Sequence, residues 1–247
     1  MKKDKLEDIF IYGKHAVMEA LAHAPHTIKR VHCSERFNEP EVRELLRAHK
    51  IEPHIMNAGL LDREVGKDTA HQGILAKIST QALMQPLDQV LKKMDMKKNP
   101  CIVILGGLYD PHNVGAVIRS AAAFGVSAVL IPERNQSPVT GTVVKTSAGM
   151  AFRIPLVAIG NVNETLRHLK ERGFWTYGLA MKGNPLSREK FDRPAVFVLG
   201  NEGHGIREKT LDLCDIPLTI AMDPRCESLN AAAAAAVVLY QWSVRPV

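Results

Sequence analysis

The feature that most constrains the fold is a series of short apolar runs in the second half of the chain. The first run, 101–105, is uninterrupted, and similar runs follow at 126–131, 154–158, 175–180, 195–199 and 218–221. Strands that are buried on both faces of a parallel sheet have this composition. Helix-compatible stretches separate several of the runs, so the sequence predicts an α/β domain with a mostly parallel sheet.

The first 80 residues predict a smaller α/β unit. Short strands are expected at 9–13, 28–33, 51–55 and 73–78, and helices at 15–22 and 40–50. Pro86 and the polar stop at 97–100 then interrupt the pattern. We therefore predict one domain at 1–80, a linker at 81–99 and a second domain at 100–247. The alternative is one continuous domain on which 81–99 forms a docked helix.

Composition narrows the possible functions. The net charge of +6 permits a nucleic-acid partner without requiring one. No apolar run approaches the ~20 residues of a membrane span, and the charged N-terminus lacks a secretory apolar stretch, so a cytoplasmic protein is expected. The histidines lack metal-site spacing, and no metal is expected. The cysteines form no CxxC pair and are expected to be reduced and mostly buried; they are Cys33, Cys101, Cys214 and Cys226.

The loop after the first apolar run leads into a predicted helix. Asn113 is suited to cap that helix, because its side-chain oxygen can accept a backbone N–H. An apolar stripe follows, made of Val114, Val117, Ile118, Ala121 and Ala122. Arg119 lies about 140° round the helix from Val114, off this stripe. Arg119 is then either an ordinary surface arginine or a group that faces a phosphate near the helix N-terminus.

Two later loops also follow predicted strands. The first, 200–206, carries three glycines and Glu202, which would let the backbone approach a ligand closely. The second, 218–230, precedes six alanines, and Ser228 is suited to cap the helix that they form. Taken alone, these are a glycine-rich turn and a tightly packed helix. Neither GxGxxG nor GxxxxGK[ST] is present, which disfavours hydride and phosphoryl transfer.

Taken together and in order, the three loops resemble the SpoU (TrmH) family of RNA ribose methyltransferases, within the SPOUT superfamily. The resemblance rests on 110–115 with 119–120, on the Gly-x-Glu-Gly-x-Gly turn that begins at Gly200, and on the segment that ends in Ser228-Leu229-Asn230. Residues 12–17 and 71–74 extend it to the L30e-like substrate-binding domain of the ribosomal-RNA guanosine branch. The sequence departs from the family at Ala221, where a proline is usual, and at Pro224, where a glycine is usual.

This resemblance implies a deep trefoil knot in the C-terminal domain, an exception to the rule that chains do not thread loops. It also implies an S-adenosyl-L-methionine site in the knot and a homodimer through this domain. The implied cofactor-binding residues are Leu199, Gly200, Gly203, Ile220, Met222 and Leu229. The implied residues of the reaction site are Asn113, Arg119, Glu202, Ser228 and Asn230.

The implied activity is 2′-O-methylation of a ribose, and the branch resemblance favours a guanosine in structured ribosomal RNA. A hydroxyl at the 2′ position restricts the acceptor to RNA, and an L30e-like module favours folded RNA. Transfer RNA is the alternative substrate. An alternative of another class is a non-catalytic RNA-binding or ribosome assembly protein that uses the same surface.

Overall fold

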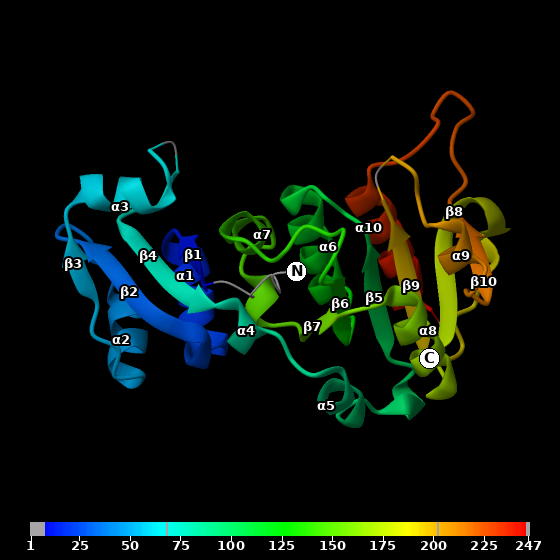
Figure 1. Cartoon of the computed structure of the whole chain (residues 1–247), viewed down its shortest axis with the longest axis horizontal. Coiled ribbons are helices and arrows are strands. Elements are labelled where there is room, and N and C mark those ends of the chain that lie inside the picture. The colour runs from blue at the N-terminus through cyan, green and yellow to red at the C-terminus, as the bar shows by residue number, and fades with distance from the viewer. Residues whose placement is uncertain (1–7, 68, 202, 246–247) are drawn as a thin grey trace. The chain divides into compact units, whose positions relative to one another are not determined.

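The computed structural model describes residues 8–67, 69–201 and 203–245. The chain forms two compact units (Figure 1). Unit 1 comprises Met1–Met84 with Val139–Arg153, and unit 2 comprises Gln85–Pro138 with Ile154–Val247. The sequence places the stretch Val139–Arg153 in the second domain, whereas its contacts group it with the N-terminal residues.

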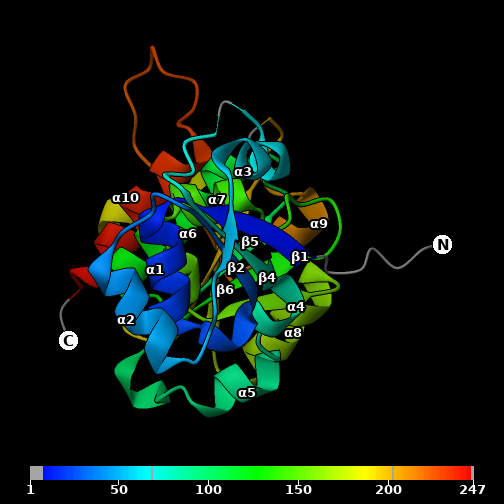
Figure 2. The same cartoon turned by 90° about the vertical axis from the view of Figure 1, so that its left-hand side faces the viewer.

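Unit 1 is built on a four-stranded sheet in the order β1-β4-β2-β3. β4 pairs antiparallel with β1 and β2, and β3 adds to β2 in parallel. The strands are β1 (Asp8–Tyr12), β2 (Ile28–Ser34), β3 (His54–Met56) and β4 (Ile74–Ser79). The helices are α1 (Lys14–His23), α2 (Pro40–Ala48), α3 (Ala58–Val65), α4 (Thr80–Leu83) and α7 (Gly141–Thr146), with 3₁₀ turns η1 (Pro25–Thr27) and η3 (Met150–Phe152). Figure 2 shows α1 and α2 side by side.

The stretch Val139–Arg153 is fastened to α1 by a buried carboxylate. Glu19 is buried on α1, and both of its oxygens accept hydrogen bonds from the Arg153 guanidinium, at 2.6 and 2.8 Å. These bonds hold the pKa of Glu19 below its usual value. Gly149 lies against the same side chain, where an added Cβ would meet Glu19 Cγ at 2.5 Å. The polar contact and the close packing together explain why this stretch belongs to unit 1.

Unit 2 is built on a six-stranded sheet in the order β10-β8-β9-β5-β6-β7, and every pair of neighbours is parallel. The expected α/β domain with a mostly parallel sheet is therefore confirmed. The strands are β5 (Cys101–Gly106), β6 (Ala128–Pro132), β7 (Leu156–Ile159), β8 (Trp175–Pro185), β9 (Ala195–Gly200) and β10 (Ile216–Thr219). The helical segments are α5 (Leu87–Lys92), η2 (Met96–Lys98), α6 (Pro111–Ala123), α8 (Val162–Glu171), η4 (Leu186–Arg188), α9 (Glu208–Leu211) and α10 (Ala231–Ser243).

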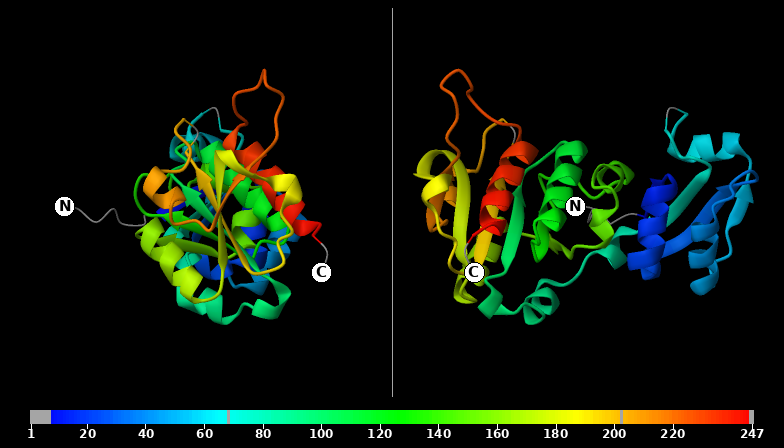
Figure 3. Two further views of the ribbon diagram at one scale, coloured as in Figure 1. Left: turned by 90° about the vertical axis from the view of Figure 1, so that its right-hand side faces the viewer. Right: turned by 180° about the vertical axis from the view of Figure 1, so that it is seen from behind.

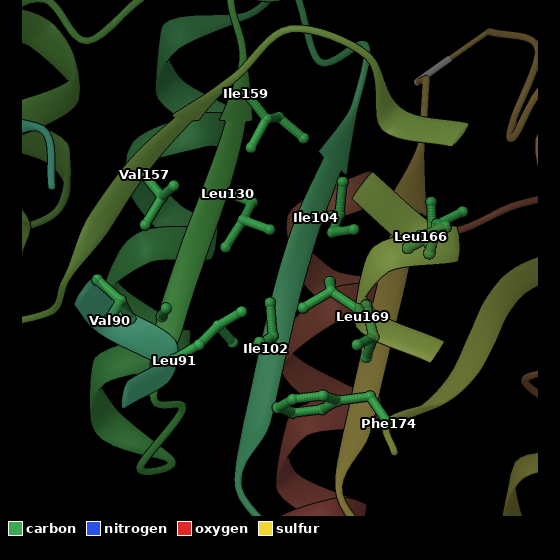
Figure 4. Packing of buried hydrophobic residues seen from close by; sticks show 13 residues of the cluster. Val90, Leu91, Ile102, Ile104, Leu130, Val157, Ile159, Leu166, Leu169 and Phe174 are labelled. Carbon is green, nitrogen blue, oxygen red and sulfur yellow. The ribbon is translucent and has the colours of Figure 1, made fainter. Parts of the chain in front are cut away.

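Alternate residues of the central strands fill the two faces of this sheet. Ile102 and Ile104 of β5 point to the face that α5 and α8 cover, together with Leu166 and Phe174 (Figure 4). On the other face lie α6 and α10, and the predicted stripe of α6 is fully buried apart from Ala122. Burial on both faces explains why the strands read as continuous apolar runs.

The cysteines differ in their burial. All four cysteines are free, but only Cys33 and Cys101 are buried; Cys214 is half-buried and Cys226 is exposed. The expectation of mostly buried thiols is thus wrong for Cys226, which lies in an exposed loop. Among the helices that the structure describes, none is both long and apolar enough to cross a bilayer.

Candidate active site

Two of the three motif loops begin at neighbouring strand ends, and the third follows β10, which β8 separates from β9. Gly106 of β5 and Gly200 of β9 are partners in the parallel register, so the segments that follow them start side by side. A Cβ on Gly106 would collide with the Leu199 carbonyl, and one on Gly200 would collide with the backbone of Gly205 and Ile206. Glycine is needed at both positions so that the backbones can approach closely at this edge. Ligands of open α/β sheets bind outside the carboxyl ends of the strands, which is where these loops lie.

The loop after β5 is held by a buried glutamine. Gln136, 8% exposed, accepts hydrogen bonds through Oε1 from the backbone N–H groups of Gly107 (3.1 Å) and Leu108 (2.9 Å). The Leu108 carbonyl in turn accepts from the Ser137 N–H at 2.8 Å, and the Leu108 side chain is fully buried. The loop is therefore fixed before any ligand arrives.

Asn201 ties this loop to the glycine-rich turn after β9. Its Nδ2 donates to the Gly107 carbonyl at 2.8 Å, while its Oδ1 accepts from the N–H groups of Gly203 (2.8 Å) and His204 (3.1 Å). Asn201 and Gly205 also exchange two backbone hydrogen bonds of 2.9 Å. Gly203, predicted to bind the cofactor, is exposed but already uses its N–H within the turn. Glu202, predicted for the reaction site, lies outside the described residues.

The helix after the first loop begins earlier than predicted. Asp110 caps α6, its carboxylate accepting from the His112 N–H at 2.8 Å, and Pro111 occupies the first helical position. The expectation that Asn113 caps this helix is wrong, because Asp110 followed by proline starts it three residues sooner. Asn113 instead lies buried in the first turn, and its Oδ1 accepts a 2.9 Å hydrogen bond from Asn230 Nδ2.

The last helix begins later than predicted. Asn230 caps α10, accepting from the N–H groups of Ala232 (2.9 Å) and Ala233 (3.2 Å). The expectation that Ser228 is the cap is wrong, because Asn230 directly precedes the first helical residue and its side chain accepts these hydrogen bonds. Asn230 thus caps α10 with its oxygen and reaches α6 with its nitrogen. Two residues predicted for the reaction site, Asn113 and Asn230, are brought together.

Arg119 is exposed on α6, as its place off the apolar stripe predicted. It lies six residues after Asn113, about 9 Å farther along the helix axis. Within the part of the chain that the structure describes, its guanidinium makes no hydrogen bond or ion pair. The structure therefore leaves Arg119 available at the surface and does not join it by contact to Asn113, Ser228 or Asn230.

The segment between β10 and α10 is the exposed part of this edge. Figure 3 shows it, in orange-red, extending away from the sheet of unit 2. Ile220 and Met222 are half-buried, whereas Ala221 and residues 223–230 are exposed. Its side-chain bonds are mostly local: Asp223 accepts from the Arg225 guanidinium at 2.9 Å, which lowers the pKa of Asp223. Both departures from the family pattern, Ala221 and Pro224, fall in this exposed stretch.

The remaining predicted cofactor residues differ in what they present. Leu199 is buried at the end of β9, so only its backbone can face a ligand, while Leu229 is exposed. Ser228 lies in the exposed segment, where its carbonyl faces the Cys226 thiol at 3.3 Å. Among the described residues, neither Ser228 nor Leu229 makes a hydrogen bond to Gly200.

Two hollows of unit 2 lie away from these loops. One, of about 380 Å³, is lined by Pro100, Ser127 and Pro155, which precede β5, β6 and β7. The other, of about 500 Å³, is lined by Trp175 and Arg193 at the starts of β8 and β9. Both therefore lie at the amino ends of the strands, opposite the motif loops. Among the described residues, no cluster of histidine, cysteine and acidic side chains could hold a metal ion.

The N-terminal motif residues meet at the start of α1. Gly13, with a φ of 89°, precedes the helix, and Gln72 Oε1 accepts from the Lys14 N–H at 2.9 Å in place of a local cap. His71 contacts Asp62 at 3.0 Å and accepts from the Gly73 N–H. These contacts give the motif a structural role in unit 1.

Residues 100–240 match the SpoU rRNA Methylase family, and residues 10–83 match the RNA 2′-O ribose methyltransferase substrate-binding family. The chain belongs to the SpoU methylase family. Its expected identity as an RNA methyltransferase is thereby confirmed.

Individual relatives of this SpoU methylase match along almost its whole length. The 23S rRNA (guanosine-2′-O-)-methyltransferase RlmB of Pseudomonas putida is 33% identical, over 94% of each chain. The protein of the same name from Shewanella oneidensis is 32% identical, over 96% of this chain and 97% of its own. The SpoU methyltransferase AviRb of Streptomyces viridochromogenes, solved in complex with AdoMet, superposes with a TM-score of 0.80 at 24% identity, covering 96% and 89%. This last likeness shows a shared fold.

The sequence analysis missed the residues that build the loops. Gln136, Asn201 and Asp110 were not among the predicted site residues, although each fixes the backbone at this edge. Asp110 had a signal, since an acidic residue before a proline is typical of a helix start. Gln136 had none, because a single polar residue after a strand is ordinary.

Proposed function

We propose that this SpoU methylase transfers a methyl group from S-adenosyl-L-methionine to the 2′-hydroxyl of a guanosine in structured large-subunit ribosomal RNA. The observation that carries the proposal is that relatives named for this reaction match both the substrate-binding and the methylase portions of the chain. The domain boundaries 1–80, 81–99 and 100–247, apart from the stretch Val139–Arg153 that lies in unit 1, are part of the same proposal. An L30e-like fold of the first domain and a cytoplasmic location belong to it as well.

The cofactor is proposed to bind at the carboxyl edge of β9 and β10. The half-covered side chains of Ile220 and Met222 and the exposed Leu229 offer apolar surface for a flat ring. The glycine-rich backbone after Gly200 is exposed at the same edge of the sheet, with β8 between β9 and β10, and offers polar backbone groups. This combination fits an adenosine-containing ligand, and Leu199 and Gly203 would contribute backbone. When bound, the sulfonium supplies an already activated methyl group.

The chain's own residues would mainly position the acceptor, because methyl transfer needs in-line geometry and loss of the hydroxyl proton. Arg119 stays protonated at neutral pH and is a poor base. We assign it to the RNA phosphate and to the oxygen that develops negative charge, with the proton passing to phosphate or water. Asn113 and Asn230 would orient the ribose from their shared hydrogen bond, and Ser228 and Glu202 complete the proposed reaction site.

A knot and a homodimer belong to the proposal as well. α10 carries an exposed, mostly apolar stripe that would fit a second copy: Ala233, Val237, Tyr240 and Val244, spaced three or four residues apart. Light scattering on the full chain tests the dimer, which a monomer at micromolar concentration would exclude.

Two measurements test the activity. Calorimetry with S-adenosylhomocysteine distinguishes a methyltransferase from an RNA-binding assembly protein, since the latter has no need of this ligand. Mapping of 2′-O-methylation in RNA from cells with and without the gene identifies the acceptor. Loss of one guanosine mark in 23S ribosomal RNA is the expected result. Loss of a mark in transfer RNA would replace the proposed substrate, and no binding with no lost mark would remove the enzymatic function.

A further inference from the structure

Tyr109 is an exposed aromatic side chain on the loop after β5, which is hydrogen-bonded to Gln136 and Asn201. The residue is 58% exposed, among the largest values for a large hydrophobic residue in the described structure. The loop that carries it connects β5 to α6, directly before the capping residue Asp110. Asn113 is four positions after Tyr109, so their Cα atoms lie within about 14 Å of each other.

The backbone on both sides of Tyr109 is fixed. On the N-terminal side, the N–H groups of Gly107 and Leu108 bond to Gln136, and the Leu108 side chain is buried. On the C-terminal side, Asp110 caps α6. A loop fixed in this way sets the position of the Tyr109 Cα before any ligand binds, and tyrosine has only two side-chain torsions to order on binding.

The other tyrosines of unit 2, unlike Tyr109, pack against aromatic rings. Tyr177 is buried against Phe191 and Phe197. Tyr240 is 55% exposed, but its ring packs edge-on against Phe124 at 5.8 Å. Tyr109 has no ring or cation partner among the described residues. Its π-face is therefore open on the edge of the sheet where the acceptor must lie.

We propose that Tyr109 stacks on the base of the nucleotide whose ribose is methylated. The inference rests on the proposed RNA 2′-O-methylation and adds the contact that holds the target base. Proteins that recognise RNA in a sequence-specific way take unpaired bases and stack them on aromatic side chains. Stacking fixes the nucleotide from its base while Arg119 and the Asn113–Asn230 pair address its phosphate and ribose.

Substitutions at position 109 separate stacking from other roles. Tyr109→Ala should lower kcat/KM for RNA about tenfold, mainly through KM, because one base–aromatic stack contributes on this scale. Tyr109→Phe keeps the ring and should stay within about twofold of wild type, whereas Tyr109→Leu keeps only apolar bulk and should resemble Ala. Melting temperature and affinity for S-adenosylhomocysteine should not change. An equal loss in Phe and Ala would overturn stacking in favour of a hydroxyl contact.

A double-mutant cycle identifies the base. The substrate is an RNA fragment carrying the mapped guanosine, prepared with its base and in an abasic form. If Tyr109 stacks on that base, Tyr109→Ala should have no further effect on the abasic fragment. The same tenfold loss on both fragments would overturn the assignment to the target nucleotide.

RNA binding tests the stacking by residue 109 even if no methyl transfer is found. In Tyr109→Trp, the new indole should lose fluorescence when a 23S ribosomal RNA transcript is added, while the two native tryptophans provide the background in wild type. Failure of wild type to methylate this transcript, with quenching intact, would reject the proposed activity and keep the stacking surface. Absence of quenching would reject the stacking surface.

Discussion

The loop after β5 and the segment after β10 lie at the same edge of one sheet and are built in opposite ways. In the first, the backbone of Gly107 and Leu108 is hydrogen-bonded to Gln136 and Asn201, which are both distant in sequence. Residues 221–229 are exposed, and their side-chain bonds join near neighbours such as Asp223 and Arg225. The first loop is shaped by the fold, whereas the second has little to hold it until something binds.

This difference suggests a division of labour. In the proposed reaction, the fixed loop and α6 would provide the side that receives the acceptor, where preorganised geometry accelerates reaction. The exposed segment would provide the cofactor side, where Ile220, Met222 and Leu229 offer partly exposed apolar surface. The following predictions test the contrast, beginning with the largest effect.

Gly200→Ala should have the largest effect on stability. The added Cβ would collide with the backbone of Gly205 and Ile206, which cannot move without breaking the turn that Asn201 organises. Overpacking against backbone should cost about 3 kcal/mol or more in free energy of unfolding. Chemical denaturation measures it. Gly203→Ala is the matched control, since its Cβ would meet only Asn201 Oδ1 at 3.4 Å, and equal stability of the two variants would contradict the prediction.

Arg119→Ala should reduce turnover by about 100-fold, the scale seen when one transition-state donor is removed. Unfolding free energy should change by no more than about 0.5 kcal/mol, because the side chain is exposed and unpaired among described residues. Lysine should rescue only partly, since it keeps the charge without the planar fork.

The assay is transfer of labelled methyl to RNA at saturating cofactor, alongside thermal melting. Arg167→Ala, which removes an exposed arginine from α8 on the other face of the sheet, serves as the control. Normal turnover in Arg119→Ala would remove this residue from the mechanism, and a large fall in melting temperature would make its role structural.

Gln136→Ala should destabilise the fixed loop by about 2 kcal/mol, because two backbone N–H groups lose their shared acceptor. Methyl transfer should fall with it, since Tyr109 and α6 are placed by this loop. Gln136→Glu, which keeps a hydrogen-bond acceptor, should retain more of the stability and more of the methyl transfer. Thermal melting and kcat/KM measure the effects, and unchanged values in the alanine variant would show that the loop holds itself.

The smallest effect is expected in limited proteolysis, which compares cleavage in the exposed segment with cleavage in the loop after β5. Trypsin should cut early after Arg225, whose side chain is 91% exposed in the open segment. Chymotrypsin should spare the bond after Tyr109, which is exposed as well but lies between the bonded backbone of Leu108 and the start of α6. S-adenosylhomocysteine should slow the Arg225 cut several-fold by mass action on the closed form. Rapid cleavage at both sites would contradict the contrast between the loops.

Sequence patterns predicted those parts of the structure that depend on local or periodic signals. Apolar runs identified the buried strands, and the stripe of α6 placed Arg119 at the surface. The caps were misplaced because several cap-forming side chains compete at both helix starts: Asp110 with Asn113, and Asn230 with Ser228. The bonds of Gln136 to Gly107 and of Asn230 to Asn113 join residues 29 and 117 apart, and no local pattern encodes such contacts.

The placement of Val139–Arg153 in unit 1 bears on how such a protein can be divided or recombined. The backbone passes from one unit to the other three times, after residues 84, 138 and 153. A cut in the linker would leave this stretch without α1, exposing Val143 and Val144 and stripping Arg153 of its carboxylate partner. Residues 1–84 alone therefore do not make up the whole of unit 1. A chimera that exchanges substrate-binding halves between relatives would have to carry both stretches together.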